Sequence, residues 1–348
     1  MISEAVIESI LRIEIERAER ENDISLSTGL MGICTFLFWF SRTFNKKCYA
    51  KIAHEKLNLI NSSISMQMPL DAENGLSGIG IGYAYLLKES FINDDPDVLL
   101  KALDNHIYKI VMQGLTKYPK DVFRFENTFL DVMIYLSWRL NNSLSNDKVE
   151  RNIHTELLQL LLNTVYQNQT DLFYNEPLPF SLNFKLPKFL NVMACAHKVD
   201  ICKMRIERIL NECEIDLLTK FPYSHSNRLY LLQSMSEILK EVGLNERWIK
   251  YMNFLLNSVN VNELINEEIA KNNLFAMDGL LGVFLLSERC RANINGFVFS
   301  YDSFLLHIQK SDYSLAKYRI EDEGKYIGLN GILGLIMVEY LLEKKLKK

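Results

Sequence analysis

The chain has 348 residues, 48% of them hydrophobic, with a formal net charge of −4. This composition supplies a sizeable buried core and excludes a disordered chain. A slightly acidic chain whose one basic cluster is its last six residues argues against a nucleic-acid-binding protein.

The first residues, 1–23, mix acids and bases at helical spacing and lack the uncharged apolar segment of a secretion signal. The most apolar run near the start, residues 29–40, is too short to span a bilayer. The six cysteines are dispersed and form no CxxC motif, which argues against a disulfide framework. We therefore predict a cytoplasmic protein without membrane insertion.

Apolar residues at spacings of three and four predict helices along the chain, for example over 49–64, 99–115 and 156–166. Alternation with period two is nearly absent, and glycine and proline number only 15 and 7. The sequence therefore predicts an all-α fold.

A Gly-Leu-x-Gly motif occurs four times, and an apolar run follows each copy. The first interval is 46 residues, the last is 49, and the gap between them, 204 residues, holds four steps of similar length. This period predicts seven repeats of about 50 residues, each with two helices. The predicted structural glycines are Gly29, Gly32, Gly75, Gly78, Gly279, Gly282, Gly328 and Gly331.

Three repeats in the long gap have lost the glycines. The segments are 126–140, with Thr128 and Asp131 in the glycine positions; 225–239, with Ser226 and Leu229 there; and 181–196.

The glycine-rich stretch 75–82 raises the alternative of a phosphate-binding loop. Such a loop needs a preceding strand, and residues 63–74 are a poor strand. A cofactor motif would also not recur four times. Because glycine has no Cβ, we interpret the motif as a helix start at which backbones approach closely, on the inner ring of a closed double ring.

A seven-fold helical ring with Gly-x-x-Gly opening each inner helix resembles the lanthionine synthetase C-like family, the lanthipeptide cyclases. The resemblance implies an (α/α)7 toroid formed by residues 1–348 as a single domain. It also implies the family's reaction, in which a peptide cysteine thiol adds to a dehydroalanine or dehydrobutyrine. Zinc activates that thiol by favouring the thiolate.

In this family the zinc ligands are a Cys before one inner-helix motif and a Cys-His pair directly before the next motif's glycine. Here Met277 and Asp278 precede Gly279, and the unit before carries His225 without a Cys. The family's Ala-His-Gly stretch is also missing, since the fourth unit reads FSLNFKLP. We predict no metal site of the family's type and no cofactor, with zinc held only if unconventional ligands serve.

The catalytic candidates are His225 and Asp278, and we predict that His225 takes the place of Asp278 in its own repeat. Candidate substrate contacts at the mouth of the toroid are Asn74, Asp131 and Asn330. Four other histidines are predicted to be structural or surface residues; they are His54, His106, His154 and His307.

Three functions stay open at this point. The first is a zinc-less relative of the cyclases that binds a precursor peptide or a peptide-modifying partner enzyme during maturation of a ribosomally made peptide. The second is an active thioether-forming cyclase with unusual zinc ligands. The third is a carbohydrate-active α/α barrel, which needs two carboxylates beside the scissile bond; the candidates are Glu73, Glu126, Asp131 and Asp278.

Overall fold

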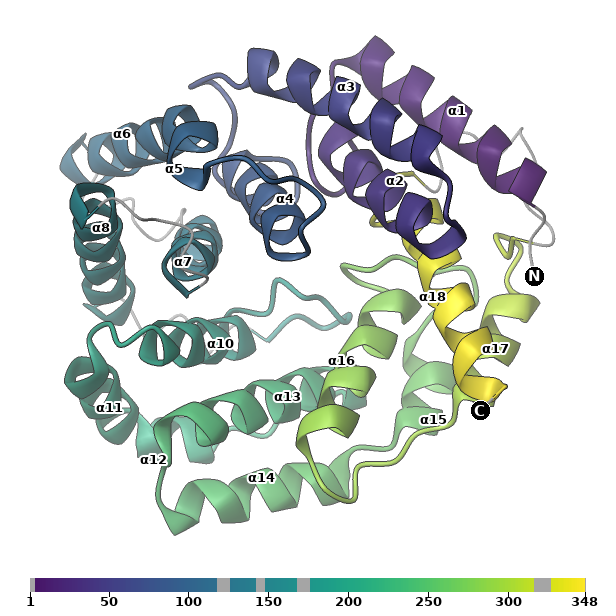
Figure 1. The fold of residues 1–348 in the computed structure, drawn as a ribbon. Coiled ribbons are helices and arrows are strands. Elements are labelled where there is room, and N and C mark those ends of the chain that lie inside the picture. The colour runs from purple at the N-terminus through teal and green to yellow at the C-terminus, as the bar shows by residue number, and fades with distance from the viewer. Residues whose placement is uncertain (1–3, 118–125, 142–147, 168–175, 316–326, 348) are drawn as a thin grey trace. The chain divides into compact units, whose positions relative to one another are not determined.

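The computed structural model describes residues 4–117, 126–141, 148–167, 176–315 and 327–347. This described part contains helices and loops and no strand, so the predicted all-α class is confirmed (Figure 1). None of the helices in these ranges is long and apolar enough to cross a membrane.

The helices gather into two compact units, which we call the N-terminal and the C-terminal unit. The N-terminal unit contains residues 4–168 together with 327–329, and the C-terminal unit contains 169–326 and 330–348. The prediction that 1–348 form one domain stays a prediction.

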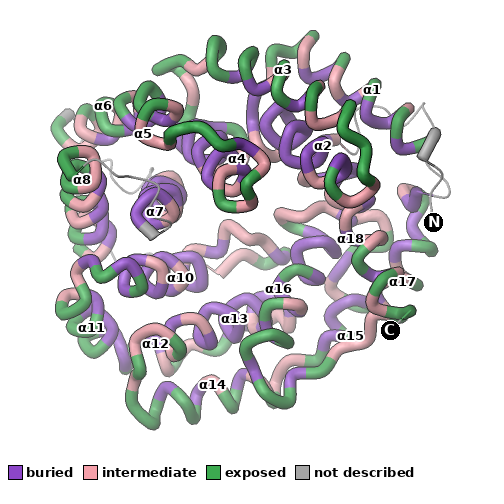
Figure 2. Tube along the Cα trace, in the orientation of Figure 1, coloured by how far each residue is buried: buried purple, intermediate pink, exposed green. Residues whose placement is uncertain are grey.

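In the N-terminal unit, α2 packs against α3 and α4, and α7 packs against α4 and α8. Figure 2 shows α2 and α4 largely buried, whereas α3 and α6 carry exposed residues along one side. The helices are α1 (Glu4–Glu21), α2 (Leu30–Phe44), α3 (Lys47–Ser63), α4 (Leu76–Lys88), α5 (Pro96–Leu99), α6 (Lys101–Lys117), α7 (Glu126–Asn141) and α8 (Lys148–Gln167).

In the C-terminal unit, α13 is the central helix and packs against α10, α14 and α16. Fully buried Trp248 of α14 and Phe284 of α16 are among the large side chains of its core. The helices are α10 (Lys185–Lys198), α11 (Lys203–Glu212), α12 (Glu214–Leu218), α13 (His225–Val242), α14 (Glu246–Ser258), α15 (Val261–Glu263), η2 (Leu264–Glu268, a π-helix), α16 (Leu280–Asn293), α17 (Tyr301–Lys310) and α18 (Ile332–Leu346).

The helix starts correct the register of two predicted repeats. Ser224 is the N-cap of α13, as Gly279 is of α16, so the glycine positions of that repeat are Ser224 and Asn227. The prediction of Ser226 and Leu229 is therefore wrong by two residues.

The second correction concerns the last repeat. The N-cap of α18 is Gly331, so the pair in register with the other motifs is Gly331 and Gly334. Gly328 precedes this pair and adopts a left-handed conformation with φ of 65°. It fits there because its Cα lies against the backbone of Ser27 and Thr28, where a Cβ would stand 2.4 Å from the Ser27 carbonyl oxygen.

Candidate functional site

The helices that begin with glycine share one loop geometry. The first residue of α4, Leu76, donates its N–H to the carbonyl of Pro69, seven residues earlier, at 2.9 Å. The same bond, again spanning seven residues, is made at the starts of α2 (2.9 Å) and α16 (3.0 Å). In each case the loop folds back over the first turn and satisfies a backbone donor that a helix start leaves unpaired.

This loop explains why two glycines stand three residues apart. A Cβ on Gly75 would lie 2.3 Å from the carbonyl oxygen of Pro69, and one on Gly78 would lie 2.1 Å from that of Ala72. The equivalent glycines of α2 and α16 meet loop backbone atoms at 2.2 to 2.6 Å; they are Gly29, Gly32, Gly279 and Gly282. The backbone that approaches these glycines is therefore that of the helix's own loop.

Two of the predicted substrate contacts hold neighbouring loops in place. The Asp131 carboxylate, 4% exposed, accepts the N–H of Ala72 at 3.1 Å. In the C-terminal unit, Asn330 Oδ1 accepts the N–H groups of Ala276 and Met277 at 3.0 and 2.9 Å. Both side chains bind the loop before a glycine-led helix, one in each unit.

Asn74, the third predicted contact, is exposed on the loop before α4. Its Oδ1 accepts the hydroxyl of Ser27 at 3.3 Å, and its N–H binds Asp71 Oδ1 at 2.7 Å. Asn74 is therefore the most open of the three to a ligand, and the role of all three in substrate binding stays a prediction.

The start of α13 uses side chains where the glycine-led helices use backbone. Ser224 Oγ accepts the N–H of Asn227 at 3.1 Å. The carboxylate of Glu268, from η2, accepts the N–H groups of His225 and Ser226 at 2.5 and 2.9 Å, and the Ser226 hydroxyl at 2.7 Å. A carboxylate at this position also interacts favourably with the helix dipole.

The imidazole of His225 is held by the segment before η2. Its Nδ1 accepts the N–H of Asn260 at 3.2 Å, so the proton of the neutral ring is assigned to Nε2. That nitrogen lies 3.2 Å from a carboxylate oxygen of Glu263. The ring thus positions the 260–263 segment.

Asp278 is exposed, directly before the N-cap of α16. Neighbouring protein removes part of its water and raises the pKa of its carboxyl. The prediction that His225 takes the place of Asp278 is wrong, because the N-cap of α13 is Ser224 and the residue before it is Tyr223.

The residues at the family's ligand positions do not fit zinc. Pro222 and Tyr223 precede one N-cap and Met277 and Asp278 the other, which supplies one carboxylate and neither a thiolate nor an imidazole. Within the described ranges, no three His, Cys, Asp or Glu side chains are grouped so that they could hold a metal ion.

The cysteines do not change this conclusion. Burial raises the pKa of the thiols of Cys34 and Cys290, and it raises that of Cys213 to about 12. These side chains therefore disfavour the thiolate that would bind a metal.

The carboxylates proposed for a glycosidase also have other partners. Asp131 is committed to the Ala72 amide. The side chain of Glu126 lies outside the described residues.

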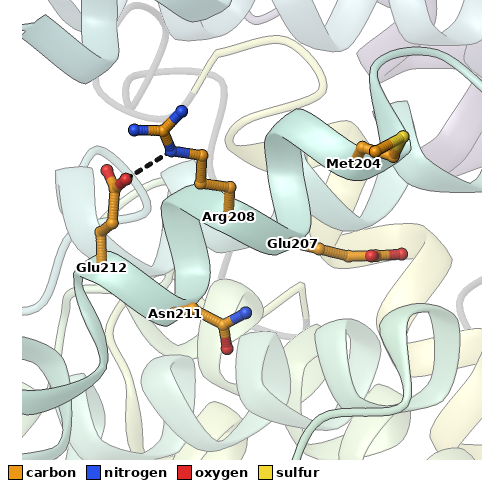
Figure 3. Close-up of a pocket in the computed structure, with 5 residues that line it drawn as sticks. All are labelled: Met204, Glu207, Arg208, Asn211 and Glu212. Atoms are coloured by element: carbon orange, nitrogen blue, oxygen red, sulfur yellow. Dashed lines mark hydrogen bonds and ion pairs between the residues drawn. The ribbon is translucent and has the colours of Figure 1, made fainter.

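A hollow of about 400 Å³ lies against α11 and contains none of the predicted site residues (Figure 3). Its lining is the exposed Met204, together with Glu207, Arg208, Asn211 and Glu212, and Arg208 Nε donates to Glu212 at 2.6 Å. The functional candidates that sequence reasoning missed are instead Tyr223 and Leu178, which are 86% and 88% exposed on the loops before α13 and α10.

Comparison with known proteins agrees with this geometry. A sequence model of the lanthionine synthetase C-like protein family matches residues 20–181, so the predicted resemblance is confirmed. No curated protein sequence matches the chain. Among solved structures, nisin cyclase is similar with a TM-score of 0.63 and 17% identity, over 97% of this chain and 93% of that one. At that identity the likeness concerns the fold, and it confirms the predicted class, an all-α (α/α)7 toroid.

Proposed function

We propose that this chain, whose residues 20–181 match the lanthionine synthetase C-like family, acts in the maturation of a ribosomally made peptide as a zinc-free binding or scaffolding relative of the cyclases. Its partner is the precursor peptide or an enzyme that modifies it. The observation that carries the proposal is a contrast at the helix starts. The loops before α2, α4 and α16 keep one geometry, while Pro222, Tyr223, Met277 and Asp278 fill the family's ligand positions.

The chain's own residues support binding better than catalysis. His225 is occupied by Asn260 and Glu263, so neither ring nitrogen is free to take a proton from a substrate thiol. Tyr223 and Leu178, in contrast, expose apolar surface. Their two loops are adjacent, because Glu176 accepts the N–H of Tyr223 at 3.0 Å. Apolar and aromatic side chains of this kind anchor peptide partners.

The first experiment measures zinc and thioether formation in the tag-free protein. We expect well below one zinc per chain by elemental analysis. With a dehydrated precursor peptide from the same gene neighbourhood, we expect the free thiol to persist, as judged by alkylation and mass spectrometry. One zinc per chain, with thioether formation that Asp278→Ala abolishes, would overturn the proposal in favour of an active cyclase.

The second experiment measures binding of the same peptide by calorimetry. We expect Tyr223→Ala and Leu178→Ala each to weaken binding by about tenfold, which corresponds to about 1.4 kcal/mol. Val298→Ala is the matched control, because Val298 is 83% exposed on the loop between α16 and α17. Equal losses in all three variants, or no binding by the unaltered protein, would contradict a peptide-binding role.

A further inference from the structure

A buried charged cluster lies in the N-terminal unit, outside the site described above. Asp104 of α6 accepts the Tyr135 hydroxyl at 2.5 Å and two N–H groups of Arg139, Nε at 3.2 Å and Nη2 at 2.9 Å. Arg139, 1% exposed, also reaches Asp97 at 3.2 Å. Two carboxylates thus share one guanidinium.

Asp104 is ionised within this cluster. Burial by itself would raise the pKa of its carboxyl, but contacts with His154, Arg139 and Tyr135 together lower it. The cluster is therefore one negative charge in excess when His154 is neutral.

A cavity of about 220 Å³ opens beside this cluster, between α6, α7 and α8. Asp104, His154 and Glu150 contribute its polar lining, and Glu150 adds a third carboxylate. Three carboxylates then stand against one guanidinium, so the cavity favours a cationic ligand over an anionic one.

His154 gives an independent indication of a missing partner. The residue lines the cavity, is 3% exposed, and places Nε2 3.3 Å from Asp104 Oδ2. Its Nδ1 is buried and has no hydrogen-bond partner among the residues that the structure describes. A buried acceptor without a partner destabilises the fold, and a ligand that donates a hydrogen bond to Nδ1 would satisfy it.

The walls and the size of the cavity define the rest of the ligand. Leu136 and Leu157 form buried apolar walls, and Tyr108 stands at the rim, 41% exposed, where an aromatic ring can face a cation. Liquid water occupies about 30 Å³ per molecule, so the cavity holds about seven non-hydrogen atoms, each about the size of a water molecule. This matches an alkyl chain of about four carbons with an ammonium end.

We propose that the cavity between α6, α7 and α8 binds an alkylammonium group, with the ammonium beside Asp104, Glu150 and His154 and the alkyl chain along the leucine walls. Two sources share this chemistry, a free alkyl diamine and the lysine side chain of a partner peptide.

Calorimetry on the full chain tests this proposal with three probes: 1,4-diaminobutane, N-acetyl-lysine methylamide and the uncharged butane-1,4-diol. We expect saturable binding of at least one ammonium probe and none of the diol. Tighter binding of the diamine identifies a free amine as the ligand, and tighter binding of the lysine amide identifies a peptide side chain.

Two variants locate the site. Glu150→Gln removes a carboxylate of the lining, and we expect it to weaken binding by about tenfold. Glu156→Gln is the matched control, because it lies on the same helix and is exposed away from the lining, and it should leave binding unchanged. Binding of the diol as tightly as the amines, no saturation by either amine, or equal losses in both variants would overturn the proposal.

Discussion

The first N–H groups of helices α4 and α13 have no partner within their own helix, and different atoms accept them in the two cases. In α4, the carbonyl of Pro69 from the helix's own loop accepts the first N–H, and two glycines make room for that loop. In α13, the carboxylate of Glu268 accepts the first two N–H groups, although it lies 42 residues or more away in the sequence.

The first turn of a helix is thus stabilised in two different ways in this protein. A start built from backbone depends on the absence of a side chain at each of its glycines, so it tolerates no substitution at these positions. A start built from side chains frees those positions for other residues but depends on one distant carboxylate. The following substitutions test this difference.

The largest effect is expected at a glycine of a backbone-built start. In Gly78→Ala the new methyl group would lie 2.1 Å from the carbonyl oxygen of Ala72, and backbone cannot move aside as a flexible side chain can. We expect the free energy of unfolding to fall by about 3 kcal/mol, measured by urea denaturation followed by circular dichroism.

Gly114→Ala in α6 is the control, because nothing lies within 4 Å of a Cβ at that position. There we expect stability to rise by about 0.5–1 kcal/mol, since alanine favours the helix. If Gly78→Ala and Gly114→Ala changed stability alike, close packing of the loop would not be the reason for the motif.

A smaller effect is expected at the side-chain-built start. Glu268→Ala removes the acceptor for His225 and Ser226, and we expect a loss of about 1–2 kcal/mol together with faster hydrogen exchange of those two amides. Glu267→Ala, one residue away and exposed, should change neither quantity. Unchanged exchange at both amides in Glu268→Ala would show that the carboxylate does not cap the helix.

The same comparison shows how far the sequence could be interpreted. Glycine spacing predicted the starts of α2, α4 and α16, because a residue without Cβ is a direct sign of close backbone packing. In α13 the sign was weaker: Ser224, a typical N-cap residue, stands where the first glycine would be. Its partner Glu268 could not be predicted, because nothing local links it to α13.

The sequence did not predict the start of α18 or the cavity, for two other reasons. The segment 328–334 contains three glycines spaced by three, so two registers fit it equally, and only the cap at Gly331 decides between them. His154 was predicted to be structural or a surface residue. Its cavity is formed by α6, α7 and α8, whose side chains meet only in the folded chain.

The smallest expected effect concerns Glu14, a buried side chain that binds the backbone of Gly328 within the N-terminal unit. Its carboxylate accepts the N–H of Gly328 at 2.8 Å and pairs with Arg17 at 3.2 Å. Burial raises its pKa above the ordinary 4.5, and the contacts with Gly328 and Arg17 only partly offset this. The folded chain therefore keeps the proton to a higher pH than the unfolded chain does. The stability that Glu14 contributes is complete below pH 4.5 and decreases as the pH rises through the raised pKa.

We expect the difference in unfolding free energy between the unaltered protein and Glu14→Gln to decrease over that range, whereas the difference for Glu16→Gln, exposed on the same helix, stays flat. A flat profile for Glu14→Gln would show that burial of this carboxylate does not make the stability of the chain depend on pH.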